Sequence, residues 1–330
     1  MRNLITDVPG VKIGHAEDAK LASGVTVIRF DAPATASGTI SGGAPGSFDT
    51  ALLEPDMTVT QVDAVFLSGG SAFGLASGTG VQAALRAQGR GFAVGPVRVP
   101  IVTGAILFDL LNGGDKNWGR MSPYAELGYA ATEAAGETFA LGTAGAGFGA
   151  TTANLKGGLG SASALTPSGF LVGAIVAVNA IGVTTMGDSP HFWAAPYEVG
   201  TEFGGLGMTS SLSSGALRIR VKGDRPATTI ACVVTDAVIT KTQAKRLALM
   251  ANDGLSHAIR PTHAPFDGDT VFFAGTGVRP LGQNALRDIT EIGTVAADCL
   301  ARAIARGVFE ARALPYPNAQ PSWRDRFGVR

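Results

Sequence analysis

Two carboxylates flank a single glycine in the segment Asp267-Gly268-Asp269, which directly precedes the apolar run 270–274. The glycine permits a tight turn, so both acids lie at the start of one expected strand. A carboxylate pair can orient a nucleophile or carry a proton, because neighbouring acids shift each other's pKa. Solvated surface turns show the same pattern, so the pair alone leaves both interpretations open.

Other motifs that would direct the chemistry are incomplete. Gly145, Gly147 and Gly149 resemble part of a dinucleotide loop, but the third glycine of that motif is not at its required offset and no acidic residue follows at the right distance. The sequence has no Gly-Lys-Ser/Thr phosphate loop and no Gly-x-Ser-x-Gly elbow. The four histidines, at positions 15, 191, 257 and 263, lack the spacing of a zinc site. We therefore expect no metal and no cofactor.

The elements that must position the carboxylates follow from hydrophobic patterns. The order of strands and helices in the last third, after a strand-rich and glycine-rich first part, predicts a layered α/β fold with helices on both sides. Thr240 and Gln243 have the spacing of a capping box. Gly293 is a candidate break in the last helix, and residues 32–46 and 184–214 have the composition of loops. The predicted strands span 24–30, 64–67, 170–179, 228–235 and 270–274, and the predicted helices span 76–86, 124–135, 240–259 and 284–306.

The composition excludes several classes of protein. The 330 residues include 26 Lys+Arg and 26 Asp+Glu, so a nucleic-acid surface is not expected. No stretch of 18 uncharged apolar residues is present, so no membrane span is expected either. Cys232 and Cys299 lie in apolar runs and the chain start has no apolar leader. These features predict buried thiols in a cytoplasmic protein.

Ordered blocks along nearly the whole chain resemble the self-processing amidohydrolases that include L-aminopeptidase D-Ala-esterase/amidase, the β-aminopeptidases and the 6-aminohexanoate-oligomer (nylon) hydrolase. The resemblance implies an αββα sandwich, similar to that of N-terminal-nucleophile hydrolases but with different connectivity, in one domain of residues 1–330. The blocks include Thr6-Asp7-Val8-Pro9-Gly10-Val11, Gly42-Gly43-Ala44-Pro45-Gly46, Leu67-Ser68-Gly69-Gly70-Ser71, Lys156-Gly157-Gly158-Leu159-Gly160-Ser161, Val178-Asn179-Ala180-Ile181-Gly182, Thr228-Thr229-Ile230 and Asp267-Gly268-Asp269-Thr270.

The same resemblance implies that the chain cuts itself between Ala227 and Thr228. An α subunit of residues 1–227 and a β subunit of residues 228–330 would result. Thr228 would then attack amide or ester carbonyls through an acyl-enzyme. A threonine hydroxyl needs a base, and a freed α-amine with a pKa of roughly 8 can serve as one.

Further site residues are also implied by the resemblance. Asn179 matches the residue that polarises a carbonyl or helps to hold the oxyanion, and Asp267 and Asp269 match the pair that contacts the nucleophile and its amine. Asn154 stands where the nylon-type members carry a lysine, which makes Lys156 a candidate replacement.

The differences from the family pattern leave two alternatives open. Phe108 replaces a tyrosine of the nylon-type members, and no acid follows Pro100 before Asp109, whereas the β-aminopeptidases hold the substrate amine with a glutamate in this region. One alternative is a related scaffold that stays uncut and binds a small ligand without hydrolysis. The other is an acyltransferase that uses the same threonine chemistry.

The expected partners are a small peptide, amide or ester substrate and further copies of the chain. The resemblance implies a homo-oligomer of αβ units, with a tetramer as one form. The polar, proline-rich tail from Pro315 to Arg330 is expected either to be loose or to clasp a neighbouring subunit.

Overall fold

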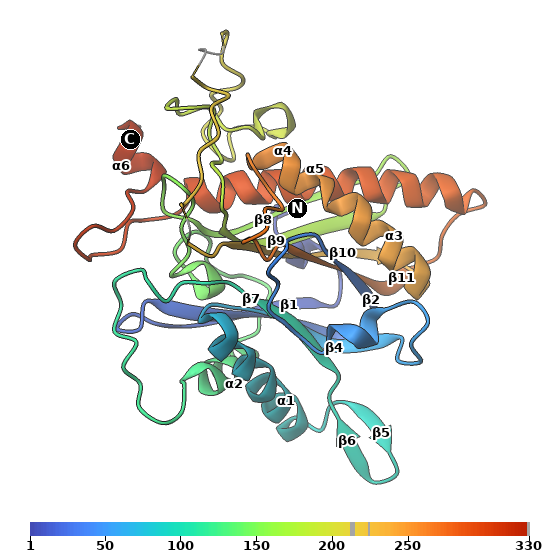
Figure 1. Ribbon diagram of the computed structural model, residues 1–330. Coiled ribbons are helices and arrows are strands. Elements are labelled where there is room, and N and C mark those ends of the chain that lie inside the picture. The colour runs from blue at the N-terminus through green and yellow to red at the C-terminus, as the bar shows by residue number, and fades with distance from the viewer. Residues whose placement is uncertain (212–214, 224, 329–330) are drawn as a thin grey trace.

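The structure, a computed structural model, describes residues 1–330 except 212–214, 224 and 329–330. Four layers follow one another in the order helix, sheet, sheet, helix (Figure 1), which confirms the predicted αββα arrangement. The outer helices on one side are α1 (Ser77–Ala87) and α2 (Tyr124–Glu133), and those on the other are α3 (Lys241–Ala251), α4 (Asp253–Ala258) and α5 (Ala285–Phe309).

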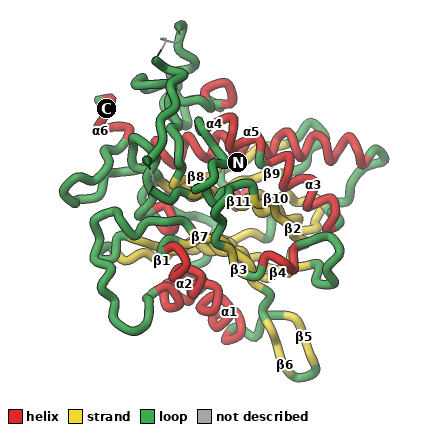
Figure 2. Tube along the Cα trace, in the orientation of Figure 1, coloured by secondary structure: helices red, strands yellow, loops and turns green. Residues whose placement is uncertain are grey.

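The two inner layers are parts of one hydrogen-bonded sheet with the strand order β3-β7-β4-β2-β11-β10-β9-β8, in which β1 also pairs with β2. Figure 2 shows these strands between the two groups of helices. The strands are β1 (Val11–Asp18), β2 (Ser23–Ile40), β3 (Ser47–Phe48), β4 (Gln61–Ser68), β7 (Val102–Ile106), β8 (Gly158–Leu165), β9 (Leu171–Asn179), β10 (Thr228–Ala237) and β11 (Thr270–Arg279). Smaller elements are the hairpin β5 (Phe92–Val94) and β6 (Val97–Val99), helix α6 (Trp323–Phe327), and 3-10 turns at Ile5–Asp7, Thr50–Leu53, Ser71–Ala76, Gly145–Gly147 and Ala195–Tyr197.

Strand β2 connects the two sheet layers. Its first half pairs with β4, and its second half pairs with β11, with a register shift between Arg29 and Ala34. The prediction of a loop over 32–46 is therefore wrong for residues 32–40. Small and polar residues have weak strand propensity, but backbone pairing on both sides of β2 overrides it.

Three clusters of buried side chains hold the layers together. The cluster between the sheets joins Ile28 and Val65 of one layer to Ile230 and Phe272 of the other. The second cluster lies under α3, α4 and α5, and the third lies under α1 and α2. Every residue of β10 is buried, as its continuous apolar run predicted.

Two helix predictions are settled by local contacts. The capping box at the start of α3 is confirmed, because Thr240 Oγ1 accepts from the N–H of Gln243 and the Gln243 side chain accepts from the N–H of Thr240. The break at Gly293 is wrong, since α5 is continuous. A Cβ at Gly293 would lie 2.3 Å from Met250 Cε, so glycine here allows α5 to approach α3 closely.

The glycine-rich block after residue 142 contains the unpredicted strand β8. A Cβ at Gly160 would lie 1.8 Å from the carbonyl oxygen of Ala303, so α5 packs directly on the backbone of this strand. Small residues replace the usual apolar alternation because the helix, and not large side chains, fills the space above the strand.

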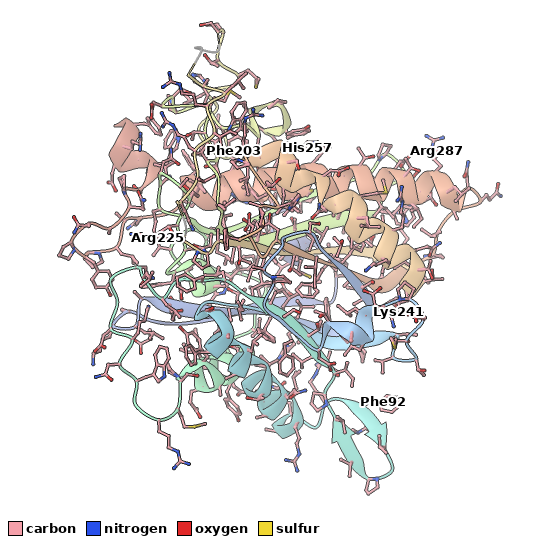
Figure 3. All side chains as sticks on the ribbon, viewed as in Figure 1. Phe92, Phe203, Arg225, Lys241, His257 and Arg287 are labelled. Carbon is pink, nitrogen blue, oxygen red and sulfur yellow. The ribbon has the colours of Figure 1, made fainter. Side chains whose placement is uncertain are left out.

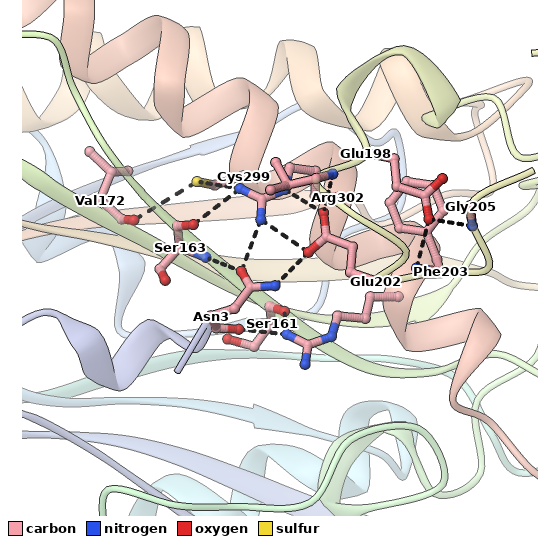
Figure 4. A network of polar contacts seen from close by, with 12 residues as sticks. Asn3, Ser161, Ser163, Val172, Glu198, Glu202, Phe203, Gly205, Cys299 and Arg302 are labelled. Atoms are coloured by element: carbon pink, nitrogen blue, oxygen red, sulfur yellow. Dashed lines mark hydrogen bonds and ion pairs between the residues drawn. The ribbon is translucent and has the colours of Figure 1, made fainter. Parts of the chain in front are cut away.

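A buried polar network also ties α5 to distant parts of the chain (Figure 4). Arg302 Nε donates to Glu202 at 2.6 Å, and both side chains are nearly inaccessible. Another nitrogen of Arg302 donates to Asn3 Oδ1 at 2.9 Å, and the carbonyl oxygen of Ser163 also accepts from Arg302. The long connection 184–214, which contains Glu202, is therefore fixed on α5 at this point.

The tail packs on its own chain over residues 315–328. Trp323 is fully buried, stacks on Phe192 and lies against Phe309. The expectation of a loose tail is wrong for this part because the tail buries a large aromatic side chain in its own fold. Contact of the tail with a neighbouring subunit stays a prediction, and residues 329–330 lie outside the described residues. Among the helices of the described ranges, none is long and apolar enough to cross a membrane.

Candidate active site

Three strand ends bring the sequence-predicted residues together. Thr228 begins β10 and pairs in register with Asn179, the last residue of β9. Strand β11 runs parallel to β10 and begins just after Asp269. An isolated parallel bridge joins Ala227 to Asp267. The pairing of β10 with both neighbours thus places Thr228 between the amide and the two carboxylates.

The carbonyl group of Ala227 is held from two directions. Its oxygen accepts a hydrogen bond from the Gly268 N–H at 3.0 Å and another from the Thr228 hydroxyl. The N–H of Ala227 donates to the carbonyl oxygen of Phe266 at 3.3 Å. Ala227 and Thr228 are only 1% and 3% exposed. A donor on a buried carbonyl oxygen is the arrangement that stabilises an oxyanion when the carbonyl carbon is attacked.

Gly268 is a site residue that sequence reasoning treated only as the centre of a turn. A Cβ at this position would lie 2.7 Å from Thr228 Oγ1 and 3.0 Å from the carbonyl oxygen of Ala44. The turn therefore needs glycine because Thr228 and the block 42–46 both approach its backbone. The sequence motif Asp267-Gly268-Asp269 indicated a turn at Gly268. The approach of Thr228 and Ala44 to the Gly268 backbone, however, depends on the packing of distant segments.

The carboxylate pair is buried, so the solvated-turn interpretation is wrong. Asp269 accepts from the Thr229 N–H at 2.8 Å and from the N–H of His263 at 3.0 Å. The ring Nδ1 of His263 lies 2.8 Å from the same carboxylate. Burial, together with the charge of Asp269, raises the pKa of Asp267 to about 8. These two effects favour a single proton shared by the pair at neutral pH.

His263 was not singled out by the sequence, because it lies in a loop without a recognisable spacing. In the structure its Nε2 lies 3.2 Å from Asn252 Nδ2, and Asn252 Oδ1 accepts from the Ser41 hydroxyl at 3.1 Å. A chain of polar contacts thus leads from Asp269 through the partly exposed His263 to Asn252 and Ser41. Within the described ranges, no three His, Cys, Asp or Glu side chains are grouped so as to hold a metal ion.

The side chain of Asn179 is fixed by three contacts. Its Oδ1 accepts from the Thr151 N–H at 3.0 Å and from Lys222 Nζ at 2.8 Å. Its Nδ2 donates to the carbonyl oxygen of Phe108 at 3.0 Å. Asn179 is thus the β9 residue paired with Thr228 of β10, and its side-chain Nδ2–H is directed to the Phe108 carbonyl oxygen. Its predicted part in polarising a carbonyl stays a prediction.

Lys156 is buried away from this amide. Its Nζ donates to the carbonyl oxygens of Gly147, Ala150 and Gly157, which uses all three of its donors on the glycine-rich block. Burial lowers its pKa to about 7. Asn154 lies nearby, and its Oδ1 accepts from the Thr152 hydroxyl at 3.2 Å. The lysine that contacts the Asn179 side chain is instead Lys222, which no sequence motif had indicated.

A cavity of about 560 Å³ is lined by residues that include Pro226, which directly precedes Ala227 in the chain. Arg225, which Figure 3 labels, lies in its wall. The carboxylate of Asp109 is buried there, where it accepts from the Ser23 hydroxyl at 2.6 Å and the Gly70 N–H at 2.8 Å. The cavity lining includes Phe108, Thr151, Lys156, Lys222, Arg225 and Pro226.

Comparison with known proteins decides the family. The family model described as "Peptidase family S58" matches residues 3–320. The chain belongs to peptidase family S58. A relative from Mycobacterium tuberculosis, named as an uncharacterized aminopeptidase, is 39% identical over 98% of this chain and 98% of its own. A 6-aminohexanoate-oligomer endohydrolase of Agromyces is 27% identical over 82% of this chain and 74% of its own.

Solved structures show the same fold as this S58 chain. A β-aminopeptidase from Burkholderia has a TM-score of 0.71 and 20% identity, covering 99% of this chain and 92% of its own. The L-aminopeptidase D-Ala-esterase/amidase from Ochrobactrum anthropi has a TM-score of 0.68 and 17% identity, covering 98% and 91%. That protein is described as a variant of the N-terminal-nucleophile hydrolase fold. As a member of a peptidase family, this S58 chain is a hydrolase of peptide or related amide bonds.

Proposed function

We propose that this chain is an autoprocessed amidohydrolase whose nucleophile is Thr228. The observation that carries the proposal is the geometry of one bond. The Ala227 carbonyl is buried, its oxygen accepts from the Gly268 N–H, and the Thr228 hydroxyl lies against it. A carboxylate pair that holds one proton lies on the same turn as Gly268.

The proposed self-cleavage is an acyl shift followed by hydrolysis. Thr228 Oγ1 attacks the carbonyl carbon of Ala227 and loses its proton, while the Gly268 N–H stabilises the oxyanion that forms. The peptide bond then breaks, and the nitrogen of Thr228 takes up a proton. Water hydrolyses the resulting ester, which leaves a carboxylate on Ala227 and a free α-amine on Thr228. The proton held by the Asp267–Asp269 pair is available within the same turn.

After the cut, the α-amine of Thr228 would serve as the base for its own hydroxyl. Its pKa of roughly 8 leaves part of the population unprotonated at neutral pH. The hydroxyl would attack an amide or ester carbonyl, expel the amine or alcohol, and form an acyl-enzyme that water hydrolyses. The subunits would be residues 1–227 and 228–330. The hydrogen bond from the Thr229 N–H to Asp269 would keep the new N-terminus in place.

The substrate class that fits is a small peptide, amide or ester. The cavity of about 560 Å³ is lined by the segment that leads to the proposed cut, up to Pro226, and its size suits a molecule of a few residues. The names of the relatives, an aminopeptidase and a hydrolase of 6-aminohexanoate oligomers, agree with linear amides as substrates. Assembly of the αβ units into a homo-oligomer is part of the same proposal.

The test is the intact mass of freshly purified protein under denaturing conditions, with N-terminal sequencing of any fragment. Cleavage at the proposed bond divides the 33.5 kDa chain into pieces of roughly two thirds and one third, the smaller beginning with Thr228. The Thr228→Ala variant is expected to remain whole and inactive. A Thr228→Ala protein that is still cut and active would overturn the assignment, and a whole wild-type chain would favour the uncut binding alternative.

A further inference from the structure

The ammonium group of Lys222 lies at the end of β9, where β9 pairs with the start of β10. Its Nζ donates to Asn179 Oδ1 at 2.8 Å and to the Asn179 main-chain oxygen at 3.0 Å. Asn179 is the residue directly opposite Thr228 in the antiparallel pair. One cation therefore holds both the side chain and the backbone of the nucleophile's strand partner.

The segment that carries Lys222 is anchored independently of the bond that is cut. The Lys222 N–H donates to the carbonyl oxygen of Ile181 at 3.1 Å. Two residues earlier, Arg220 makes two hydrogen bonds of 2.5 Å to the two oxygens of Asp188, which also accepts from Arg326 at 2.8 Å. Because a bidentate pair fixes direction as well as distance, these contacts place the Lys222 side chain.

The groups around Lys222 act on its charge in both directions. Burial lowers the pKa of Lys222 to about 7, whereas the nearby Asp267 and Asp109 favour its charged form and Lys156 and Arg225 disfavour it. An amide side chain held by two donors and one acceptor has a single orientation. Removal of the strongest donor would leave Asn179 with the Thr151 N–H and the Phe108 carbonyl alone.

We propose that Lys222 is a positioning residue for self-cleavage, which acts by fixing Asn179 opposite Thr228. The inference rests on the proposed function, since it assigns a further residue to the same step. A displacement of about 1 Å at a reacting group can cost on the order of 100-fold in rate. Lys222 touches neither Thr228 nor the Ala227 carbonyl in any recorded contact, so its effect must pass through Asn179.

The test follows the disappearance of the uncut chain over time in wild type and in Lys222 variants. Lys222→Met is expected to slow self-cleavage at least tenfold, and Lys222→Arg is expected to recover part of the loss. Lys245→Met is the matched control, because Lys245 of α3 pairs with the partly exposed Glu54. An uncut wild type would refute the proposed function, whereas normal cleavage of Lys222→Met would refute only the role of Lys222.

Two further measurements separate positioning from a general loss of structure. Alkylation of uncut Lys222→Cys with bromoethylamine restores an ammonium at the same length, and cleavage should then recover; Cys232 and Cys299 are fully buried and should not react. In an Asn179→Ala background, Lys222→Met should cause less than about a twofold further loss. No recovery on alkylation, or a full additional loss in that background, would overturn the proposal.

Discussion

The N–H of Gly268 points at the carbonyl oxygen of Ala227, with a nitrogen-to-oxygen distance of 3.0 Å. Gly268 follows Ala227 by more than forty positions in the chain, and the contact exists because β10 and β11 lie side by side and parallel. The donor for the proposed oxyanion thus lies on the turn that leads into β11, and it is in place before any bond is cut.

Substitution of Gly268 by a residue with a Cβ should slow self-cleavage. A Cβ in Gly268→Ala would lie 2.7 Å from Thr228 Oγ1, so the hydroxyl must move away from the Ala227 carbonyl. We expect self-cleavage to slow at least tenfold, equivalent to about 1.4 kcal/mol of barrier. Gly136→Ala is the control, because a Cβ there meets nothing within 4 Å. Equal cleavage rates for the two variants, followed by denaturing electrophoresis, would contradict the close approach.

The two carboxylates should differ in their tolerance of an amide. Asp269 accepts from the N–H groups of Thr229 and His263, so the amide nitrogen of Asp269→Asn would face a donor. We expect this variant to slow processing or turnover at least tenfold, about 1.4 kcal/mol. The readout is the rate of chain cleavage at pH 7.

Asp267→Asn is the matched comparison. Because burial and the charge of Asp269 raise the pKa of Asp267 and so favour its neutral form, an amide is a closer substitute at this position. We expect a smaller loss than for Asp269→Asn at pH 7. A larger loss for Asp267→Asn would mean that the ionised form of Asp267 is the one that self-cleavage requires.

The contribution of Lys156 to the free energy of unfolding should rise with pH above about pH 7. Burial lowers its pKa to about 7 in the folded chain, against about 10.4 in the unfolded chain. Between these values the unfolded chain binds a proton that the folded chain does not, so the stability contributed by this residue rises with pH. Below about pH 7 both states are protonated, and its contribution is constant at its lowest value.

The measurement compares urea unfolding of uncut Thr228→Ala protein with and without Lys156→Met, at about pH 7 and about pH 10. The protein with Lys156 should gain stability relative to the methionine variant as the pH rises. Lys222, whose pKa Lys156 helps to lower, is therefore replaced by methionine in both proteins. A difference that does not change with pH would show that Lys156 stays charged throughout.

The Arg302–Glu202 pair should hold the two proposed subunits together, because Glu202 precedes the cut and Arg302 follows it. Both side chains are about 5% exposed, and removal of one partner leaves a buried charge. Arg302→Met should lower the free energy of unfolding by roughly 3–5 kcal/mol. Denaturant unfolding measures this, with Arg287→Met as control, because Arg287 pairs with Glu291 at the surface. Equal midpoints for the two variants would show that other contacts suffice.

The sequence by itself determined the elements with strong local signals. The continuous apolar run predicted β10, and the Thr240–Gln243 spacing predicted the start of α3. Ordered blocks also identified the family, because a match at many positions in one order does not require knowledge of the packing. Local composition failed at residues 32–40 and at Gly160, where strand pairing and a helix packed on bare backbone decide the structure.

Only the tertiary structure decided which groups surround Thr228. Gly268 and His263 come from a segment about forty residues after Thr228, whereas Lys222 precedes Thr228 by six residues, and His263 and Lys222 lie outside any motif. The same packing directs Lys156, which a neighbouring position had suggested, to the carbonyl oxygens of the glycine-rich block. A sequence pattern records local propensity and family resemblance, whereas a hydrogen bond between distant segments depends on how whole layers pack.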